Sequence, residues 1–360
     1  MITFIIFIVV LGVLVLVHEL GHLIVAKWCG MKVEEFGFGF PPRLWGKKMG
    51  GTTYSINSIP FGGFVKITGE DGENKNEPNS FAAKSATRRA ATLVAGVLMN
   101  ILLAFALLVV VNFFGVRTQL DENQVDKQAK DLRVQIIQIV DNSPAVSAGL
   151  NNLDEITGFR WGGQETKVAS VSAVQNFISA HKGQKIVMLV RRGDQLMEKE
   201  IVPRVNPPAG EGSLGISLAL TGEVSYPFFK AIAEAGKQTW WLFANIVIGF
   251  ATIIKNIFTQ GSPGADLSGP IGIAQYTGQA ARVGWSYLLQ FVALISVNLA
   301  VLNLIPFPAL DGGRLLFVGL EKLRRKPMPH KVEAIINTIG FALLILLMIY
   351  VTTKDVIKFW

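Results

Sequence analysis

The chain has 360 residues, of which 50% are hydrophobic, and a mean hydropathy of +0.41. That composition is too apolar for an ordinary soluble protein of this size. The net charge of +8 is concentrated in a few loops, which indicates membrane topology, so we expect a lipid bilayer and no nucleic acid as a partner. The single cysteine, Cys29, excludes an intrachain disulfide and a zinc site made of cysteines.

The first apolar segment, residues 3–28, contains two histidines and a glutamate where such residues are rare. In a helix His18 and His22 lie one turn apart on one face, so both imidazoles can bind the same cation. Glu19 lies beside them, where it can take a proton from a metal-bound water. Because a charged side chain at the bilayer centre costs at least ~2.5–3.5 kcal/mol, these residues predict a zinc site inside the membrane.

Three further segments are long enough to cross ~30 Å of hydrocarbon, namely 90–114, 286–310 and 332–351. Lys and Arg are frequent in the loops 30–89 and 314–331, so both loops are expected in the cytoplasm. The stretch 116–205 between them is then extracytoplasmic, and its alternating apolar residues predict strands at 134–140 and 186–190 and a short helix at 174–179. We therefore predict a multi-pass α-helical membrane protein with an inserted small β-rich extracytoplasmic domain.

A shorter apolar segment, 240–254, follows this domain. From an extracytoplasmic domain to a cytoplasmic loop the chain crosses the membrane an odd number of times, and 286–310 already supplies one crossing. We therefore interpret 226–258 as an amphipathic, interfacial or re-entrant segment at the outer surface, a level that suits Trp240 and Trp241. A full span is the alternative.

The predicted organisation has four parts. They are the first two spans with a membrane-associated hairpin near 50–70 (1–115), the β-rich domain (116–205), a linker with the interfacial segment (206–285) and the last two spans (286–360).

A catalytic zinc site takes three protein ligands and a water, so the histidine pair needs one more ligand. The remaining histidines, His181 and His330, are expected at the surface. The nearest glutamates, Glu34 and Glu35, follow the first helix too closely for the chain to fold back to the site. Asp311 is the better candidate, because Pro306 and Pro308 interrupt the apolar segment before it, and irregular backbone at membrane depth occurs only where it lines protein or a wet cavity. Charge topology also places Asp311 and His22 at the same, cytoplasmic, depth.

Together these residues resemble the bacterial site-2 proteases, intramembrane zinc metalloproteases of the M50 family that include the regulator of sigma-E protease. The similarity rests on residues 18–22 and 303–313 and on the blocks 36–44, 59–66, 80–81 with 89–91, and 268–273. Residues 143–150 resemble part of a single PDZ domain. Departures at Leu153-Asp154 and Thr157-Gly158 leave open whether this PDZ-like domain binds a peptide ligand.

The resemblance implies a zinc endopeptidase of the bacterial inner membrane, with its active site near the cytoplasmic side. Its substrate would be a single-pass membrane protein, such as a trimmed anti-sigma factor, cleaved in or near the transmembrane segment. The family's membrane-associated hairpin pairs with extended substrate, so Gly62, Gly63 and Phe64 are expected to bind substrate. Asn303, Pro306 and Pro308, near the expected metal site, are the other expected substrate-binding residues. The alternative is a catalytically silent PDZ-containing membrane adaptor, which would have no reason to keep a metal site in lipid.

Overall fold

The computed structural model describes residues 2–70, 77–122, 129–193, 195–262, 264, 268–326 and 328–359. The chain forms two compact units, described separately below. The first consists of Met1–Val110 and Ile232–Trp360 and holds the long helices, and the second is Val111–Ala231. The second unit extends beyond the predicted end at residue 205, because the later strand β9 (Ile216–Val224) pairs with both β3 (Val116–Leu120) and β4 (Lys130–Ile139).

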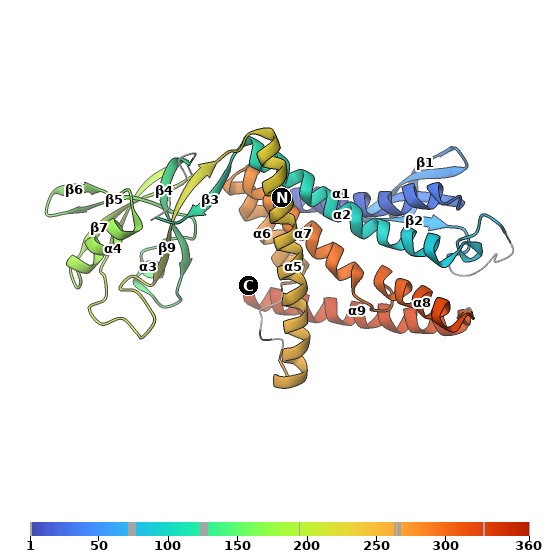
Figure 1. Cartoon of the computed structure of the whole chain (residues 1–360). Helices are drawn as coiled ribbons and strands as arrows, with labels where there is room; N and C mark the ends of the chain where they lie inside the picture. The colour runs from blue at the N-terminus through green and yellow to red at the C-terminus, as the bar shows by residue number, and fades with distance from the viewer. Residues whose placement is uncertain are drawn as a thin grey trace. The chain divides into compact units, whose positions relative to one another are not determined.

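Five helices in the described part of the chain are long and apolar enough to cross a membrane. They are α1 (Ile2–Trp28), α2 (Ala86–Phe114), α5 (Phe228–Gln260), α7 (Trp285–Leu304) and α9 (His330–Phe359), shown in Figure 1. Helices α1, α2, α7 and α9 correspond to the four predicted spans. They expose large apolar side chains such as Ile5, Val9 and Leu346, as helices that face lipid do.

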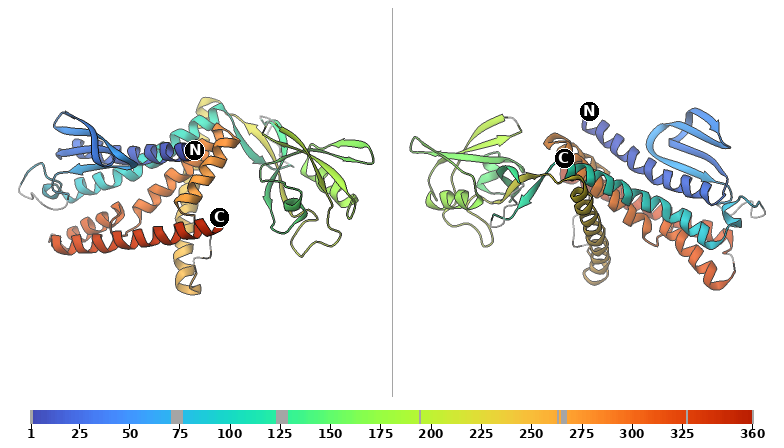
Figure 2. Two further views of the ribbon diagram at one scale, coloured as in Figure 1. Left: turned by 180° about the vertical axis from the view of Figure 1, so that it is seen from behind. Right: turned by 45° about the horizontal axis from the view of Figure 1, so that its top comes forward.

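Helix α5 is one continuous helix of 33 residues, so the re-entrant interpretation of 226–258 is wrong. It runs across the direction of α1, α2 and α9 rather than alongside them (Figures 1 and 2). Its first half packs on α2 and α7 through Ala235, Leu242 and Phe243, whereas Trp240 and Trp241 are exposed. The helix begins before the apolar stretch 240–254, because its polar first turns continue directly into that stretch.

The break between α7 and α8 (Asp311–Arg324) follows from proline and glycine. Helix α7 ends at Leu304, since Pro306 and Pro308 lack the N–H group that a helix needs. Gly312 and Gly313 then allow α8 to pack tightly on the loop, because a Cβ on either residue would overlap a loop carbonyl. Asp311 is thereby held at the first turn of α8.

The first unit also contains a sheet of β1 (Val33–Met49) and β2 (Thr52–Ile67), which begins well before the hairpin expected near residues 50–70. The strands are joined at Gly50-Gly51, where both residues have positive φ angles, 55° and 83°. Part of β1 has partners in two parts of β2, so that Phe36 is opposite both Val65 and Tyr54. Residues 63–67 of β2, in contrast, have register partners on one side only.

The second unit is a seven-stranded sheet with two short helices. The strand order is β3-β9-β4-β5-β7-β8, and β6 pairs with β5. The remaining elements are β5 (Glu155–Trp161), β6 (Gln164–Lys167), β7 (Ile186–Arg192), β8 (Gln195–Ile201), α3 (Pro144–Ser147) and α4 (Val171–Ala180). Ile136, Phe159 and Met188 of the sheet and Val174 of α4 are fully buried in one core. The predicted strands at 134–140 and 186–190 and the helix at 174–179 are confirmed.

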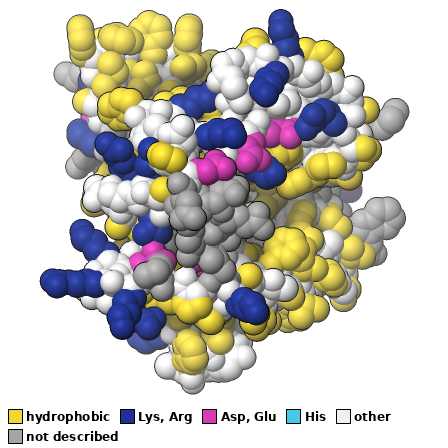
Figure 3. All heavy atoms as spheres, turned by 90° about the vertical axis from the view of Figure 1, so that its right-hand side faces the viewer, with side chains coloured by type: hydrophobic (Ala, Val, Ile, Leu, Met, Phe, Trp, Pro, Cys, Tyr) yellow, Lys and Arg dark blue, Asp and Glu magenta, His cyan; other side chains and the backbone are white. Residues whose placement is uncertain are grey.

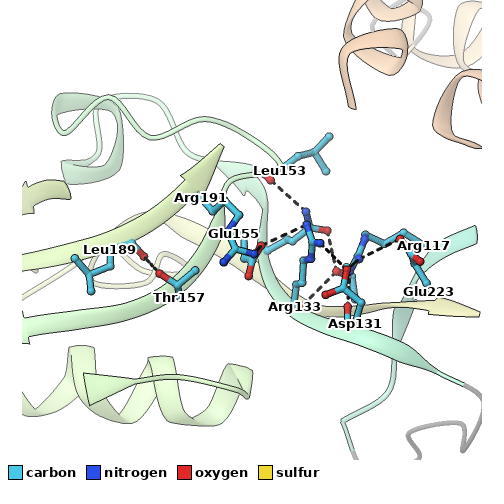
Figure 4. Close-up of polar contacts among 11 residues, drawn as sticks. Arg117, Asp131, Arg133, Leu153, Glu155, Thr157, Leu189, Arg191 and Glu223 are labelled. Atoms are coloured by element: carbon cyan, nitrogen blue, oxygen red, sulfur yellow. Dashed lines mark hydrogen bonds and ion pairs between the residues drawn. The ribbon is translucent and has the colours of Figure 1, made fainter. Parts of the chain in front are cut away.

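Charged side chains around Arg133 connect the strands β3, β4, β5 and β7 of this unit (Figure 4). Arg133 donates to the Asp131 carboxylate at 2.5 Å, and Arg117 of β3 pairs with the same carboxylate. Glu155 of β5 lies 3.5 Å from Arg133 and 3.4 Å from Arg191 of β7. The hydrogen bond from Arg133 and the charge of Arg117 hold the pKa of Asp131 below its ordinary value.

Candidate metal centre

Three side chains from two helices converge on one point in the first unit. His18 and His22 of α1 are buried, with exposed fractions of 7% and 6%. The Asp311 Oδ2 atom of α8 lies 3.0 Å from His18 Nε2 and 3.2 Å from His22 Nε2, and the two Nε2 atoms are 3.1 Å apart. Within the described residues, this is the one group of His, Cys, Asp or Glu ligands close enough to hold a metal ion.

The spacing and the chemistry of these donors fit zinc. Ligand atoms ~2.0–2.1 Å from a tetrahedral zinc lie about 3.3 Å from one another, close to the three separations found here. The Nδ1 atom of His22 donates to the Thr92 carbonyl at 2.8 Å, so in the neutral ring Nε2 carries a lone pair directed at the centre. Two imidazoles and a carboxylate leave a fourth position for water, as in catalytic zinc sites.

Helix α2 supplies no ligand but lies directly against the histidine pair. A Cβ on Gly96 would be 2.6 Å from His18 Cε1, so only glycine leaves room for the ring. A Cβ on Gly21 of α1 would likewise overlap the Ala95 carbonyl. The two helices can therefore approach closely at this level.

Glu19 follows the first ligand and lies beside β2. Its carboxylate is close enough to interact electrostatically with His18, His22 and Asp311. A Cβ on Gly63 would be 3.7 Å from Glu19 Cγ, so the outer strand 63–67 passes next to this side chain. The arrangement thus places a carboxylate next to both the metal site and a strand whose other edge has no register partner in the described chain.

Two ion pairs hold α8, and with it Asp311, against the rest of the unit. Arg314 pairs with Glu70, just beyond the end of β2. Arg89 of α2 pairs with Glu321 at 2.7 Å, and both side chains are largely buried, with exposed fractions of 16% and 14%.

The predicted substrate-binding residues have different surroundings. Gly63 lies next to Glu19, whereas the Phe64 ring covers Gly37 and Pro308 packs against Gly340 of α9. Gly62 has a positive φ of 110° and faces the Phe40 ring.

Asn303, in the last turn of α7, and Pro306, in the loop after it, differ from these. Pro306 is exposed. The Asn303 side chain is partly exposed and forms no hydrogen bond with the described residues.

Three of the other candidate ligands have different partners from the metal centre. His181 belongs to the second unit, where its ring stacks on Phe177. Glu34 pairs with Lys66 at 2.9 Å, and Glu35 accepts a hydrogen bond from Ser55 at 2.6 Å. The side chain of His330 lies outside the described residues.

Sequence reasoning assigned no role at the metal site to the part of α2 that faces the histidines. Thr92, Gly96 and Asn100 follow one another at intervals of four, which puts them on one face of a helix. Polar and small residues at this spacing in an apolar segment were the available signal.

Comparison with known proteins agrees with this geometry. The family model described as peptidase family M50 matches residues 6–347. A Clostridium perfringens protein, provisionally named a zinc metalloprotease, is 36% identical over 96% of this chain and 95% of its own length. Zinc metalloprotease RasP of Geobacillus kaustophilus is 30% identical over 98% of this chain and 97% of its own, and RasP of Oceanobacillus iheyensis is 30% identical over 99% of both. The chain therefore belongs to peptidase family M50 and is a multi-pass membrane zinc metalloprotease.

Proposed function

We propose that the protein cleaves single-pass membrane proteins in or near their transmembrane segments, as in regulated intramembrane proteolysis of a trimmed anti-sigma factor. The observation that carries this proposal is the position of the centre: His18, Glu19 and His22 lie within α1, a helix with the length and hydropathy of a membrane span. A substrate that reaches Glu19 must then be embedded in the membrane itself. The intact donor set and the family also disfavour the silent adaptor.

Glu19 is suited to act as general base and general acid. Bound zinc would supply a Lewis acid that lowers the pKa of its water towards ~7 and polarises the scissile carbonyl. His18, His22 and Asp311 would hold it, and the Glu19 carboxylate would accept the water's proton and donate it to the leaving amine. Asn303 offers a side-chain amide, without a hydrogen bond to the described residues, to the substrate backbone.

The outer strand 63–67 is suited to receive the substrate. A helical substrate hides its backbone N–H and C=O groups, and must unwind before hydrolysis. In an apolar environment the freed groups need partners, which the open edge of a strand can provide. Because Gly63 lies next to Glu19, a segment added at this strand would pass close to the catalytic carboxylate.

The charge distribution supports a cytoplasmic location for the active site. One apolar cluster joins the end of α1, the beginning of α2 and α8. Exposed basic side chains surround this end, among them Lys27, Lys32, Arg88, Lys322 and Arg324, and Figure 3 shows several Lys and Arg side chains on this face. The positive-inside rule then orients this end to the cytoplasm of a bacterial inner membrane and the second unit to the opposite side.

The transverse helix α5 would lie in the outer interface. Trp240 and Trp241 are exposed on it, and indole rings favour that level of the bilayer. The competing assignment, a fifth span, would bring the far end of α5 to the cytoplasmic side.

A groove in the second unit would bind an extended peptide. A cavity of about 560 Å³ lies between α4 and the beginning of β9, lined by residues that include Ile178, Leu214 and Leu218. Residues 216–219 of β9 pair with β4 but not with β3, so within the described residues one edge is open to strand addition.

The proposed activity is tested with a single-pass substrate of short ectodomain, reconstituted in liposomes with the protease. Wild type is expected to release fragments cut in or near the transmembrane segment. Glu19→Gln should reduce the rate by ~10²–10⁴-fold while retaining zinc. Glu234→Gln, in the Glu234–Lys237 pair on α5, is a matched control and should cleave normally. Normal cleavage by Glu19→Gln, or cleavage confined to water-soluble segments, contradicts the proposal.

Orientation is tested by cysteine labelling in a Cys29→Ser background. Lys185→Cys in the second unit and Lys322→Cys on α8 should react with an impermeant maleimide from opposite sides of the membrane. Labelling from one side would refute the orientation without affecting the proposed chemistry.

A further inference from the structure

The side-chain amide of Asn100 faces the Nδ1 atom of His18, on the side of the ring away from the other two ligands. Asn100 is fully buried in α2, and its amide nitrogen lies 3.4 Å from His18 Nδ1. Its Oδ1 atom is buried and has no hydrogen-bond partner in the described part of the molecule. An unsatisfied buried carbonyl in apolar surroundings is costly and requires an explanation.

The zinc-binding state of His18 explains this amide. The Nε2 atom of His18 faces His22 and Asp311, so a neutral ring that gives its Nε2 lone pair to the metal carries its proton on Nδ1. That N–H group needs an acceptor, and an amide nitrogen cannot accept. A half turn of the Asn100 amide exchanges its oxygen and its nitrogen, which are of similar size. Oδ1 then lies where it can accept the Nδ1 proton of His18, so that Oδ1 and the Nδ1–H group each have a hydrogen-bond partner.

We infer that Asn100 is a positioning residue whose Oδ1 accepts the Nδ1 proton of His18 and so fixes the tautomer and orientation of this ligand. Thr92 has the same relation to His22 through its main-chain carbonyl, at 2.8 Å. The two acceptors are eight residues apart on one face of α2. The Ser296 hydroxyl donates to the main-chain carbonyl of Asn100 at 2.7 Å, which ties this turn of α2 to α7.

Three variants separate this role from simple packing. Asn100→Leu preserves the approximate volume but removes the acceptor, whereas Asn100→Asp keeps an oxygen at the same position. Ser296→Ala is the matched control, because it weakens the same contact between α2 and α7 without touching His18. Zinc affinity is measured on the purified full chain in detergent by competition with a chromogenic chelator, which needs no substrate. Thermal unfolding monitors the fold.

Asn100→Leu is expected to bind zinc about 10–100-fold more weakly, since loss of a residue that hydrogen-bonds to a metal ligand and orients it typically has an effect of this size. Asn100→Asp and Ser296→Ala should remain within about threefold of wild type, the former because a carboxylate also orients a zinc-bound histidine. Unchanged affinity in Asn100→Leu, or an equal loss in Asn100→Leu and Asn100→Asp, would overturn the assignment. If Asn100→Leu does not fold, Asn100→Ala replaces it with the same expected loss. The readout is zinc binding, so the inference stands or falls independently of the proposed substrate.

Discussion

Gly96 of α2 approaches His22 of α1 so closely that a Cβ on Gly96 would lie 2.5 Å from His22 Nε2. The atom it would meet is the one that faces the other two ligands. The metal centre therefore requires a glycine at this position, because any larger residue would displace the imidazole of His22.

Gly96→Ala should displace one or both imidazoles and reduce zinc affinity by at least about tenfold. The protein should remain folded, since alanine favours a helix more than glycine does. Chelator competition on the purified protein measures the affinity. Gly319→Ala on α8 is the control, because a Cβ there meets nothing within 4 Å, and it should bind zinc like wild type. Full zinc affinity in Gly96→Ala would show that α2 can move away.

The Arg89–Glu321 pair should stabilise the position of α8. Both side chains are largely buried, so removal of either partner leaves a charge without its counterion. Arg89→Met and Glu321→Met should each lower the free energy of unfolding by about 1–3 kcal/mol, and the double variant by less than their sum. Denaturant titration in detergent completes this cycle. The Glu234–Lys237 pair, whose Lys237 side chain is 72% exposed, should show a coupling of at most about 0.5 kcal/mol. Additive single effects at Arg89 and Glu321 would contradict the argument.

The second unit should lose part of its stability in acid through Asp131. The folded pKa of Asp131 lies below its ordinary value, chiefly because Arg133 donates to its carboxylate. The associated stabilisation is present above the unfolded pKa of ~3.9 and is lost as pH falls through the folded pKa. It should amount to at most about 1 kcal/mol, because the carboxylate is 44% exposed.

Asp131→Asn isolates this contribution, since asparagine tolerates the φ angle of 49° found here. Hydrogen exchange of the β3 and β4 amides should show weaker protection in the variant at pH 7 and converge with wild type in acid, well below the unfolded pKa. Asp141→Asn, at an exposed residue outside the ion pairs of the described chain, should leave protection unchanged at both pH values. A difference that persists in acid would assign the effect to something other than charge.

The ligands on α1 were predictable because the spacing of His18 and His22 is a local property of one helix. Asp311 could be added because prolines and basic loops report chain breaks and membrane depth, and the structure places it 3.0 Å from His18. Asn100 could not be assigned a role in this way. Its contact with His18 depends on how α1 and α2 are rotated and shifted against each other, which periodicity within one helix does not determine.

The limits of the second unit and of α5 were harder to predict for a related reason. Strand β9 belongs with β3 and β4 through pairings far apart in sequence, so the linker composition near residue 206 marked a loop within the unit. Helix α5 begins at Phe228, well before the apolar stretch. Glu234 and Lys237 pair at 2.9 Å along its first turns, and these charged residues make the segment look shorter in a search for apolar spans.

Asp355 should anchor the short helix α6 (Pro270–Val283) to the end of α9. Its carboxylate is 2% exposed and accepts a hydrogen bond from the Gly272 N–H at 2.7 Å, in the first turn of α6. That turn offers N–H groups without partners in the helix, together with the positive end of its dipole. Asp355→Leu should lower the free energy of unfolding in detergent by about 1–2 kcal/mol, and Asp355→Asn by less than half of that, because the amide oxygen still accepts. Zinc affinity should be unchanged in both, since α6 contributes no group to the metal centre. An equal loss of stability in the two variants would mean that the negative charge, and not the hydrogen bond, holds α6 in place.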